Sequence, residues 1–161
     1  MKNKGGKKLI KKRGKVIRRS GVIMNKKEIL DFINSNPACH LSTVEGDQPR
    51  VRGMLMYRAD ENGILFHTGD FKDLYKNLQQ NSNVELCFNS TESGKQVRVS
   101  GKAKFIEDQN LKSEIVNERS FLKPWIDEQG YDMLKVFRVT ECIATVWTME
   151  TNFDPKKYIE L

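Results

Sequence analysis

The sequence has little cysteine and no long apolar run. Its three cysteines, Cys39, Cys87 and Cys142, are an odd number and lie far apart, which argues against a disulfide framework and for a reducing compartment. No two of them have the spacing of a metal site. No apolar stretch approaches the length that crosses a bilayer. We therefore expect a cytoplasmic globular protein without a metal centre.

Familiar catalytic motifs are also missing. There is no Walker A loop, no G-x-G-x-x-G, no H-E-x-x-H and no nucleophile elbow. Cys39 and His40 are adjacent, but consecutive residues of a strand point to opposite faces, so they cannot form a nucleophile–base pair. No two acidic residues are placed for general acid–base work. A hydrolase or transferase that acts through its own side chains is poorly supported, and no catalytic residue is identified.

Acidic residues are absent from the first 23 positions. Ten of the 28 Lys and Arg residues lie there, which leaves 18 basic and 21 acidic residues in 24–161. We read 1–23 as a basic, disordered leader and 24–161 as one mildly acidic domain. The leader lacks the apolar segment of a signal peptide. It is a tail for nucleic acid or a membrane surface, a solvated extension without a role, or an artefact of start-site choice, with Met24 as the natural first residue.

Short strand-like segments outnumber helical patterns, and turn sequences join most of them, which favours antiparallel pairing. The predicted helices are 25–36, capped by Asn25, 71–81, capped by Asp70, and a third that Asp108 caps and that ends near Glu118. The predicted strands are 38–44, 49–58, 64–68, 84–88 and 95–107, with a closing hairpin of 133–139 and 142–149 after an irregular segment, 121–131. This pattern predicts a mainly β protein with peripheral helices, a closed or split antiparallel β-barrel.

An anion site is predicted where strands 49–58 and 64–68 meet the next helix. The guanidinium of Arg52 is a planar fork that matches phosphate oxygens, and Gly53 permits close approach to the backbone. Thr68 and Lys72 reach the same side, where N–H groups at the helix start favour an anion. The alternative is a solvated strand face. The arrangement points to a phosphate on a small cofactor.

A second segment of interest is 96–103, Gln-Val-Arg-Val-Ser-Gly-Lys-Ala. Polar and apolar residues alternate along it, as in a half-buried strand. Gln96 offers an amide to a polar ring edge. The alternative is an ordinary amphipathic strand in which Gly101 marks a bulge.

Taken in order, these motifs resemble the pyridoxamine 5′-phosphate oxidase-like family of FMN-binding split barrels, and especially its short members related to general stress protein 26. The resemblance covers about residues 25–149. The matching motifs are Arg52, Asp60-Glu-Asn-Gly63, Phe66-His-Thr68, Gln80-Asn-Ser82, Val84-Glu-Leu-Cys-Phe88 and Gln96-Val-Arg-Val-Ser-Gly-Lys-Ala103.

The resemblance implies a role for each matching residue. Arg52 would bind the FMN phosphate, together with Lys72. Gln96 would reach the ring edge from a second subunit, and Trp147 matches, by position only, an aromatic residue near the ring. The residues implied to lie against the flavin are Gly53, Met54, Leu55, Tyr57, His67 and Thr68.

The resemblance further implies a homodimer with two flavins at the subunit interface. The flavin would pass electrons or hydride from a nicotinamide to a small acceptor such as a quinone or nitro compound. Three departures argue against a true pyridoxamine phosphate oxidase. Lys72-Asp-Leu74 replaces the family's Ser-Arg-Lys cluster, Tyr57 stands where the substrate lysine is found, and 138–161 lacks the C-terminal Arg-x-His.

Several alternatives stay open. The chain could be a nitroimidazole-resistance-type reductase, with His67 beside the flavin. Haem or a deazaflavin could replace FMN, because a fold does not fix its ligand. The barrel could also be a non-catalytic ligand-binding or sensor module whose basic tail associates with nucleic acid or a membrane.

Overall fold

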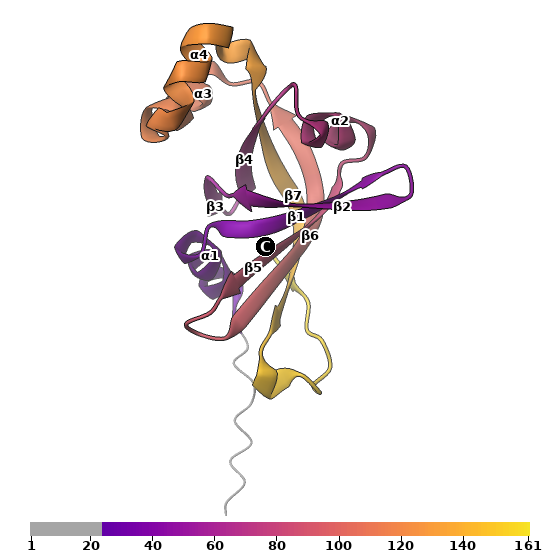
Figure 1. Ribbon diagram of the computed structural model, residues 1–161. Helices are drawn as coiled ribbons and strands as arrows, with labels where there is room; N and C mark the ends of the chain where they lie inside the picture. Colours follow the sequence, from indigo (N-terminus) through magenta and orange to yellow (C-terminus); the bar gives the residue numbers. More distant parts are fainter. Residues whose placement is uncertain (1–23) are drawn as a thin grey trace, which may run out of the picture.

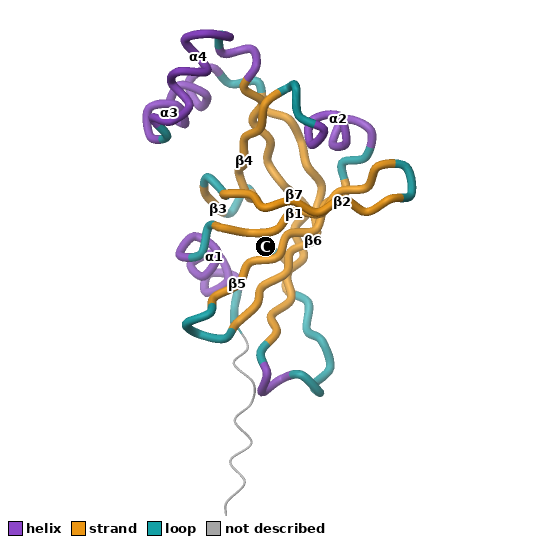
Figure 2. The backbone as a smooth tube through the Cα atoms, viewed as in Figure 1, coloured by secondary structure: helices purple, strands orange, loops and turns teal. Residues whose placement is uncertain are grey.

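The computed structural model describes residues 24–161, so the predictions for 1–23 lie outside the described residues (Figures 1 and 2). The helices are α1 (Lys26–Ser35), α2 (Asp73–Gln80), α3 (Gln109–Glu118) and α4 (Lys123–Gln129). The strands are β1 (Ala38–Glu45), β2 (Gln48–Leu55), β3 (Arg58–Asp60), β4 (Gly63–Gly69), β5 (Asn83–Ser90), β6 (Lys95–Ile106), β7 (Leu134–Trp147) and β8 (Ile159–Glu160).

These strands form one antiparallel sheet in the order β2-β1-β5-β6-β7-β4-β3, with β8 paired to β7. The two ends of this order, β2 and β3, are consecutive in the chain and are separated only by Met56 and Tyr57. The chain therefore passes directly from one edge of the sheet to the other, which curls the sheet into a split barrel. The predicted mainly β split-barrel fold is confirmed. The single strand predicted over 49–58 is wrong, because Met56 bonds to Pro37 and Tyr57 to Leu65 instead.

The barrel interior is an apolar core to which most strands contribute. Leu41, Phe66, Leu86 and Phe137 are fully buried in it, and the rings of Phe66 and Phe137 stack with their centroids 5.4 Å apart. Helix α1 packs against the same core through buried apolar residues one turn apart, Ile29 and Ile33. This core fixes the strands that carry the candidate site.

The start of α1 is stabilised by a capping box, as the sequence predicts for Asn25. The Asn25 side chain accepts a hydrogen bond from Glu28 N (3.0 Å), and Glu28 reaches back to Asn25 N (2.7 Å). We expect Asn25→Ala to lower the free energy of unfolding by about 1 kcal/mol in urea denaturation. Lys27→Ala is the control, because its exposed pair with Asp31 is worth only about 0.5 kcal/mol. Equal losses in the two variants would contradict the capping argument.

Helices α3 and α4 cover the outer face of β4 and β7. Leu65 and Val136 are buried there against Leu111, Ile115 and Ile126. Strand β4 is therefore buried on both faces. Figure 1 shows α3 and α4 together beyond one end of the sheet. The irregular segment predicted over 121–131 is wrong, because Pro124 lies in the first turn of α4, where a missing N–H costs nothing.

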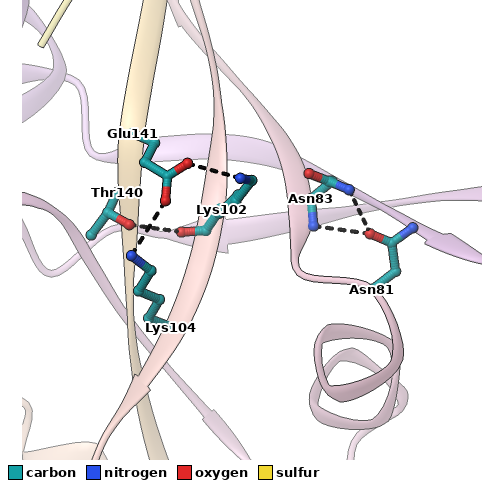
Figure 3. A network of polar contacts seen from close by, with 6 residues as sticks. All are labelled: Asn81, Asn83, Lys102, Lys104, Thr140 and Glu141. Carbon is teal, nitrogen blue, oxygen red and sulfur yellow. Dashed lines mark hydrogen bonds and ion pairs between the residues drawn. The ribbon is translucent and has the colours of Figure 1, made fainter.

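The closing hairpin predicted over 133–149 is also wrong. Strand β7 is continuous and contains a bulge, where its register with β6 shifts between Ser100 and Lys102. Glu141 has a positive φ of 54° there, and its carboxylate pairs with Lys102 (2.9 Å) and Lys104 (3.3 Å) across the bulge (Figure 3). Gly101 is required opposite it, because a Cβ would lie 2.7 Å from Thr140 O. The bulge considered at Gly101 is confirmed.

Candidate functional site

Arg52 lies on β2 and takes part in a hydrogen-bond network that links β2, β1 and α2. Its Nη1 donates to Thr43 Oγ1 on β1 at 2.9 Å, and the same oxygen accepts from Asn77 Nδ2 of α2 at 3.4 Å. Burial lowers the pKa of Arg52, while the nearby charge of Asp73 raises it. A guanidinium stays protonated in proteins and has five N–H donors. Arg52 is therefore a half-buried positive charge beside the first turns of α2, with donors to spare.

The connection from β4 to α2 forms one wall of a pocket of about 130 Å³. Its polar lining comes from His67, Thr68 and Lys72, and its apolar lining includes Phe71 and Trp125. Thr68 is 4% exposed, and its Oγ1 has no hydrogen-bond partner among residues 24–161. A buried hydroxyl without a partner is costly. An unpartnered hydroxyl therefore lies buried beside this pocket, which Lys72 also lines.

Helix α2 begins later than the sequence predicts. Its N-cap residue is Lys72, whose side chain makes no capping hydrogen bond, and the first helical residue is Asp73. The predicted cap at Asp70 is wrong, because residues 69–72 form a turn closed by Lys72 N and Gly69 O (3.2 Å). The Asp70 backbone N–H donates to Met133 O instead (2.9 Å).

His67 is half-buried on β4 and has an unusual partner. Its Nε2 lies 2.6 Å from Arg119 Nη1, and Arg119 follows directly after α3. Burial, with the charges of Arg119 and Lys72, lowers the pKa of His67 to about 4. His67 is therefore neutral at pH 7.

Tyr57 is held by residues of its own chain. Its hydroxyl donates to Glu114 Oε1 at 2.7 Å, and the guanidinium groups of Arg58 and Arg119 lie 5.5 and 5.4 Å from the ring centroid. Burial and the hydrogen bonds with Glu114 and Glu118 raise the pKa of Tyr57. Tyr57 thus anchors α3 to the break between β2 and β3.

Three further residues that the resemblance places against the flavin, Gly53, Met54 and Leu55, lie on β2. They differ in their exposure to solvent. Gly53 is exposed, with open space where a Cβ would stand, and Leu55 is 48% exposed. Met54 points the other way and packs on the barrel core. Only Gly53 and Leu55 therefore offer a free surface to a ligand or a partner.

Gln96 and Trp147 form a second, separate site. They pair across β6 and β7 and line a cavity of about 420 Å³ under the C-terminal segment, together with Arg98, Lys156 and Lys157. The two cavities share no lining residue, and Figure 1 shows α2 and the C-terminal loop at opposite ends of the sheet. The structure thus groups Thr68 with Lys72 and His67, and Gln96 with Trp147, but does not join the two groups within one chain.

Sequence reasoning missed Thr43, Asn77 and Arg119. Thr43 gave a signal, because it alternates with buried Cys39 and Leu41 on the inward face of β1 and is itself polar and 1% exposed. No sequence signal pointed to Asn77 or Arg119, because Asn77 contacts Thr43, 34 residues away, and Arg119 contacts His67, 52 residues away.

Other chemistry is sparse in residues 24–161. No group of three or more His, Cys, Asp or Glu side chains there is placed to hold a metal ion. Burial raises the pKa of Cys39 to about 12 and that of Cys142 to about 11, so both are protonated thiols and poor nucleophiles. No helix of the described part combines the length and apolar character that a membrane span requires.

Comparison with known proteins supports this picture of the fold. The family model described as pyridoxamine 5′-phosphate oxidase matches residues 25–145. A search of curated proteins gave no match.

Several solved structures are similar to this chain. A NimC/NimA family protein from Clostridium acetobutylicum is 23% identical, covers 84% of this chain and 92% of its own, and superposes with a TM-score of 0.68. General stress protein 26 from Bacillus anthracis is 20% identical, with coverage of 86% and 100% and a TM-score of 0.65. An FAD-binding protein from Mesorhizobium loti is 14% identical, with coverage of 78% and 96% and a TM-score of 0.58. At these identities the likeness concerns the fold.

Proposed function

Because the chain belongs to the pyridoxamine 5′-phosphate oxidase family, we propose that it is a cytoplasmic FMN-binding oxidoreductase. When bound, the flavin would supply the redox chemistry, a transfer of electrons or hydride from a nicotinamide to a small acceptor. What supports the proposal is the region beside α2, where half-buried Arg52 bonds to Thr43 next to Asn77 of the helix. Lys72, the residue before the helix, lines a pocket with Thr68 close by.

Different residues bind the phosphate and the isoalloxazine ring in this proposal. Arg52 and Lys72 neutralise the phosphate, and Thr68 Oγ1 gains the partner that it lacks. Gly53 lets the isoalloxazine approach the backbone of β2, and His67 lies at the edge of the same region. With no acidic group identified for proton transfer, these residues bind and orient the cofactor.

The proposal includes a homodimer with its flavins at the subunit interface. Gln96 and Trp147 line a cavity away from Arg52, so they serve a flavin held by the partner subunit. Exposed apolar side chains on β2 and β7, Val51, Leu55 and Ile143, suit such an interface. The three cysteines are free thiols, which fits a reducing cytoplasm.

The substrate is not pyridoxamine phosphate in this proposal. Tyr57 stands where the family places a substrate lysine, and its hydroxyl is already engaged by Glu114. It therefore cannot provide the positive charge that a phosphorylated substrate requires.

A nitro compound is the second candidate for the acceptor. It is favoured by His67, a neutral imidazole that lines the pocket beside β4, and by the fold shared with the NimC/NimA family protein. With FMN bound, a nitroimidazole should oxidise the reduced protein faster than a quinone, and His67→Ala should remove that preference. Equal rates in the wild type would exclude this acceptor class.

If the protein holds no FMN, haem and a deazaflavin are the next ligands to titrate.

Arg52 tests the phosphate site directly. We expect Arg52→Ala to weaken FMN binding by about 1.5–3 kcal/mol, because a charge-assisted contact to phosphate is lost. Thr43 keeps its contact with Asn77, so the variant should fold. Titration of FMN fluorescence measures the change.

Arg50→Ala is the matched control for that titration. Arg50 lies two residues away on β2 and pairs with Glu45 at the surface (2.6 Å), so its loss should leave FMN affinity unchanged. Equal affinities of wild type and Arg52→Ala, or a similar loss in both variants, would refute the role given to Arg52.

A further inference from the structure

Arg119 is fixed in place by several contacts on one side of the barrel. Its Nη2 donates to Met56 O at 2.6 Å and its Nη1 to Leu55 O at 3.2 Å. Its guanidinium also lies over the Tyr57 ring. These contacts hold the group at the break between β2 and β3, with Nη1 2.6 Å from His67 Nε2.

The contact between Arg119 and His67 determines where the imidazole proton is. A guanidinium has five N–H donors and no acceptor, and it does not lose its proton in proteins. His67 Nε2 must therefore accept with its lone pair. In a neutral imidazole the other nitrogen then carries the hydrogen, so His67 is the Nδ1–H tautomer.

His67 lines the 130 Å³ pocket beside β4, with Thr68 and Lys72. Within residues 24–161, its Nδ1 makes no hydrogen bond and is not fully buried. Lys72 adds an ammonium group to the same lining. His67 Nδ1–H and the Lys72 ammonium are both donors, so the natural ligand atom for this pocket is an acceptor.

We propose that Arg119 is a positioning residue that holds His67 as the neutral Nδ1–H tautomer, so that Nδ1 donates a hydrogen bond to an oxygen or ring nitrogen of the ligand bound beside β4. That this ligand is the flavin rests on the proposed function. The tautomer does not, because it follows from contacts within the chain.

Nuclear magnetic resonance on the flavin-free protein tests the tautomer. In protein carrying ¹⁵N-labelled histidine, long-range ¹H–¹⁵N correlations at pH 7 should show His67 Nδ1 protonated and Nε2 unprotonated. Arg119→Met should lose this preference, and Arg119→Lys should restore it in part, because the ammonium is again a donor without a lone pair. A protonated Nε2 in the wild type would overturn the proposal, as would an unchanged tautomer in Arg119→Met.

Arg58→Met is the matched control. Arg58 also flanks the Tyr57 ring and bonds to Glu114, but no contact joins it to His67 in the described part of the chain. Its replacement should leave the His67 tautomer unchanged. A loss of the preference in Arg58→Met as well would show a general effect of local packing and would contradict the role given to Arg119.

The reduction potential of bound FMN tests whether His67 Nδ1 donates a hydrogen bond to the ligand. Arg119→Met should shift this potential relative to the wild type, whereas Arg58→Met should not, and equal potentials in all three would contradict the donor role. A wild-type protein that binds no FMN would refute the proposed function instead. The tautomer measurement, made without flavin, would still decide whether Arg119 positions His67.

Discussion

Gly63→Ala is expected to destabilise the fold by about 3–4 kcal/mol, because both its backbone and its surroundings exclude a side chain. Gly63 has a φ of 129° at the turn between β3 and β4. A Cβ there would lie 2.2 Å from Val139 O, on the strand that pairs with β4. That oxygen cannot move without disturbing the pairing of β4 and β7. Urea denaturation at pH 7 measures the loss.

Gly46→Ala is the matched control for this substitution. Gly46 also has a positive φ, 60°, in the turn between β1 and β2, but nothing lies within 4 Å of where its Cβ would stand. It should therefore cost only about 1 kcal/mol, the penalty of the left-handed backbone alone. A loss of 1 kcal/mol or less in Gly63→Ala would show that the turn adapts and would contradict the packing argument.

Acid is expected to destabilise the wild-type protein through His67, by about 3 kcal/mol between pH 7 and pH 4. The pKa of His67 falls from an ordinary 6.5 to about 4 in the folded state. Between these values the unfolded chain binds the proton and the folded chain does not. The His67 contribution is therefore complete above pH 6.5 and is lost as the pH falls toward 4.

The His67 contribution is separated from that of the carboxylates by comparing variants. His67→Gln keeps an acceptor for Arg119 but does not titrate, so its stability should fall less between pH 7 and pH 4. His40→Gln, at an exposed position on β1, should retain the full wild-type dependence. Identical pH profiles for wild type and His67→Gln would show that His67 is not neutral and buried as described.

Much of the fold could be predicted because its signals are local. The capping residues Asn25 and Asp108 begin α1 and α3 as expected, with hydrogen bonds to the first-turn N–H groups. Gly46 and Gly63 mark two of the predicted hairpin turns, where the backbone has a positive φ. Alternating apolar residues set the buried faces of β1, β5 and β6.

The errors arose where tertiary contacts override local signals. Thr140 and Glu141 suggested a turn, yet the pairing with β6 keeps β7 continuous and absorbs the irregularity as a bulge. Pro124 suggested an irregular segment, although proline is accommodated in the first turn of a helix. The start of α2 was misplaced because Asp70 is drawn into a contact with Met133, 63 residues further along.

The candidate site was predictable in part for the same reason. Thr68 and Lys72 follow closely after one hairpin in the sequence, and both line the pocket beside β4. Arg119 comes from beyond α3, and only the barrel brings it to His67. The Gln96 cavity depends on how the C-terminal segment folds back through β8, for which the sequence carries no short-range signal.

The most direct test of the central claim is a titration of the purified wild-type protein with FMN, followed by flavin fluorescence and the visible spectrum after desalting. The account predicts saturable quenching, with one flavin per chain, and a flavin spectrum that survives desalting. Unquenched fluorescence at all protein concentrations, with no flavin retained, would contradict the claim that the region beside α2 is a flavin phosphate site.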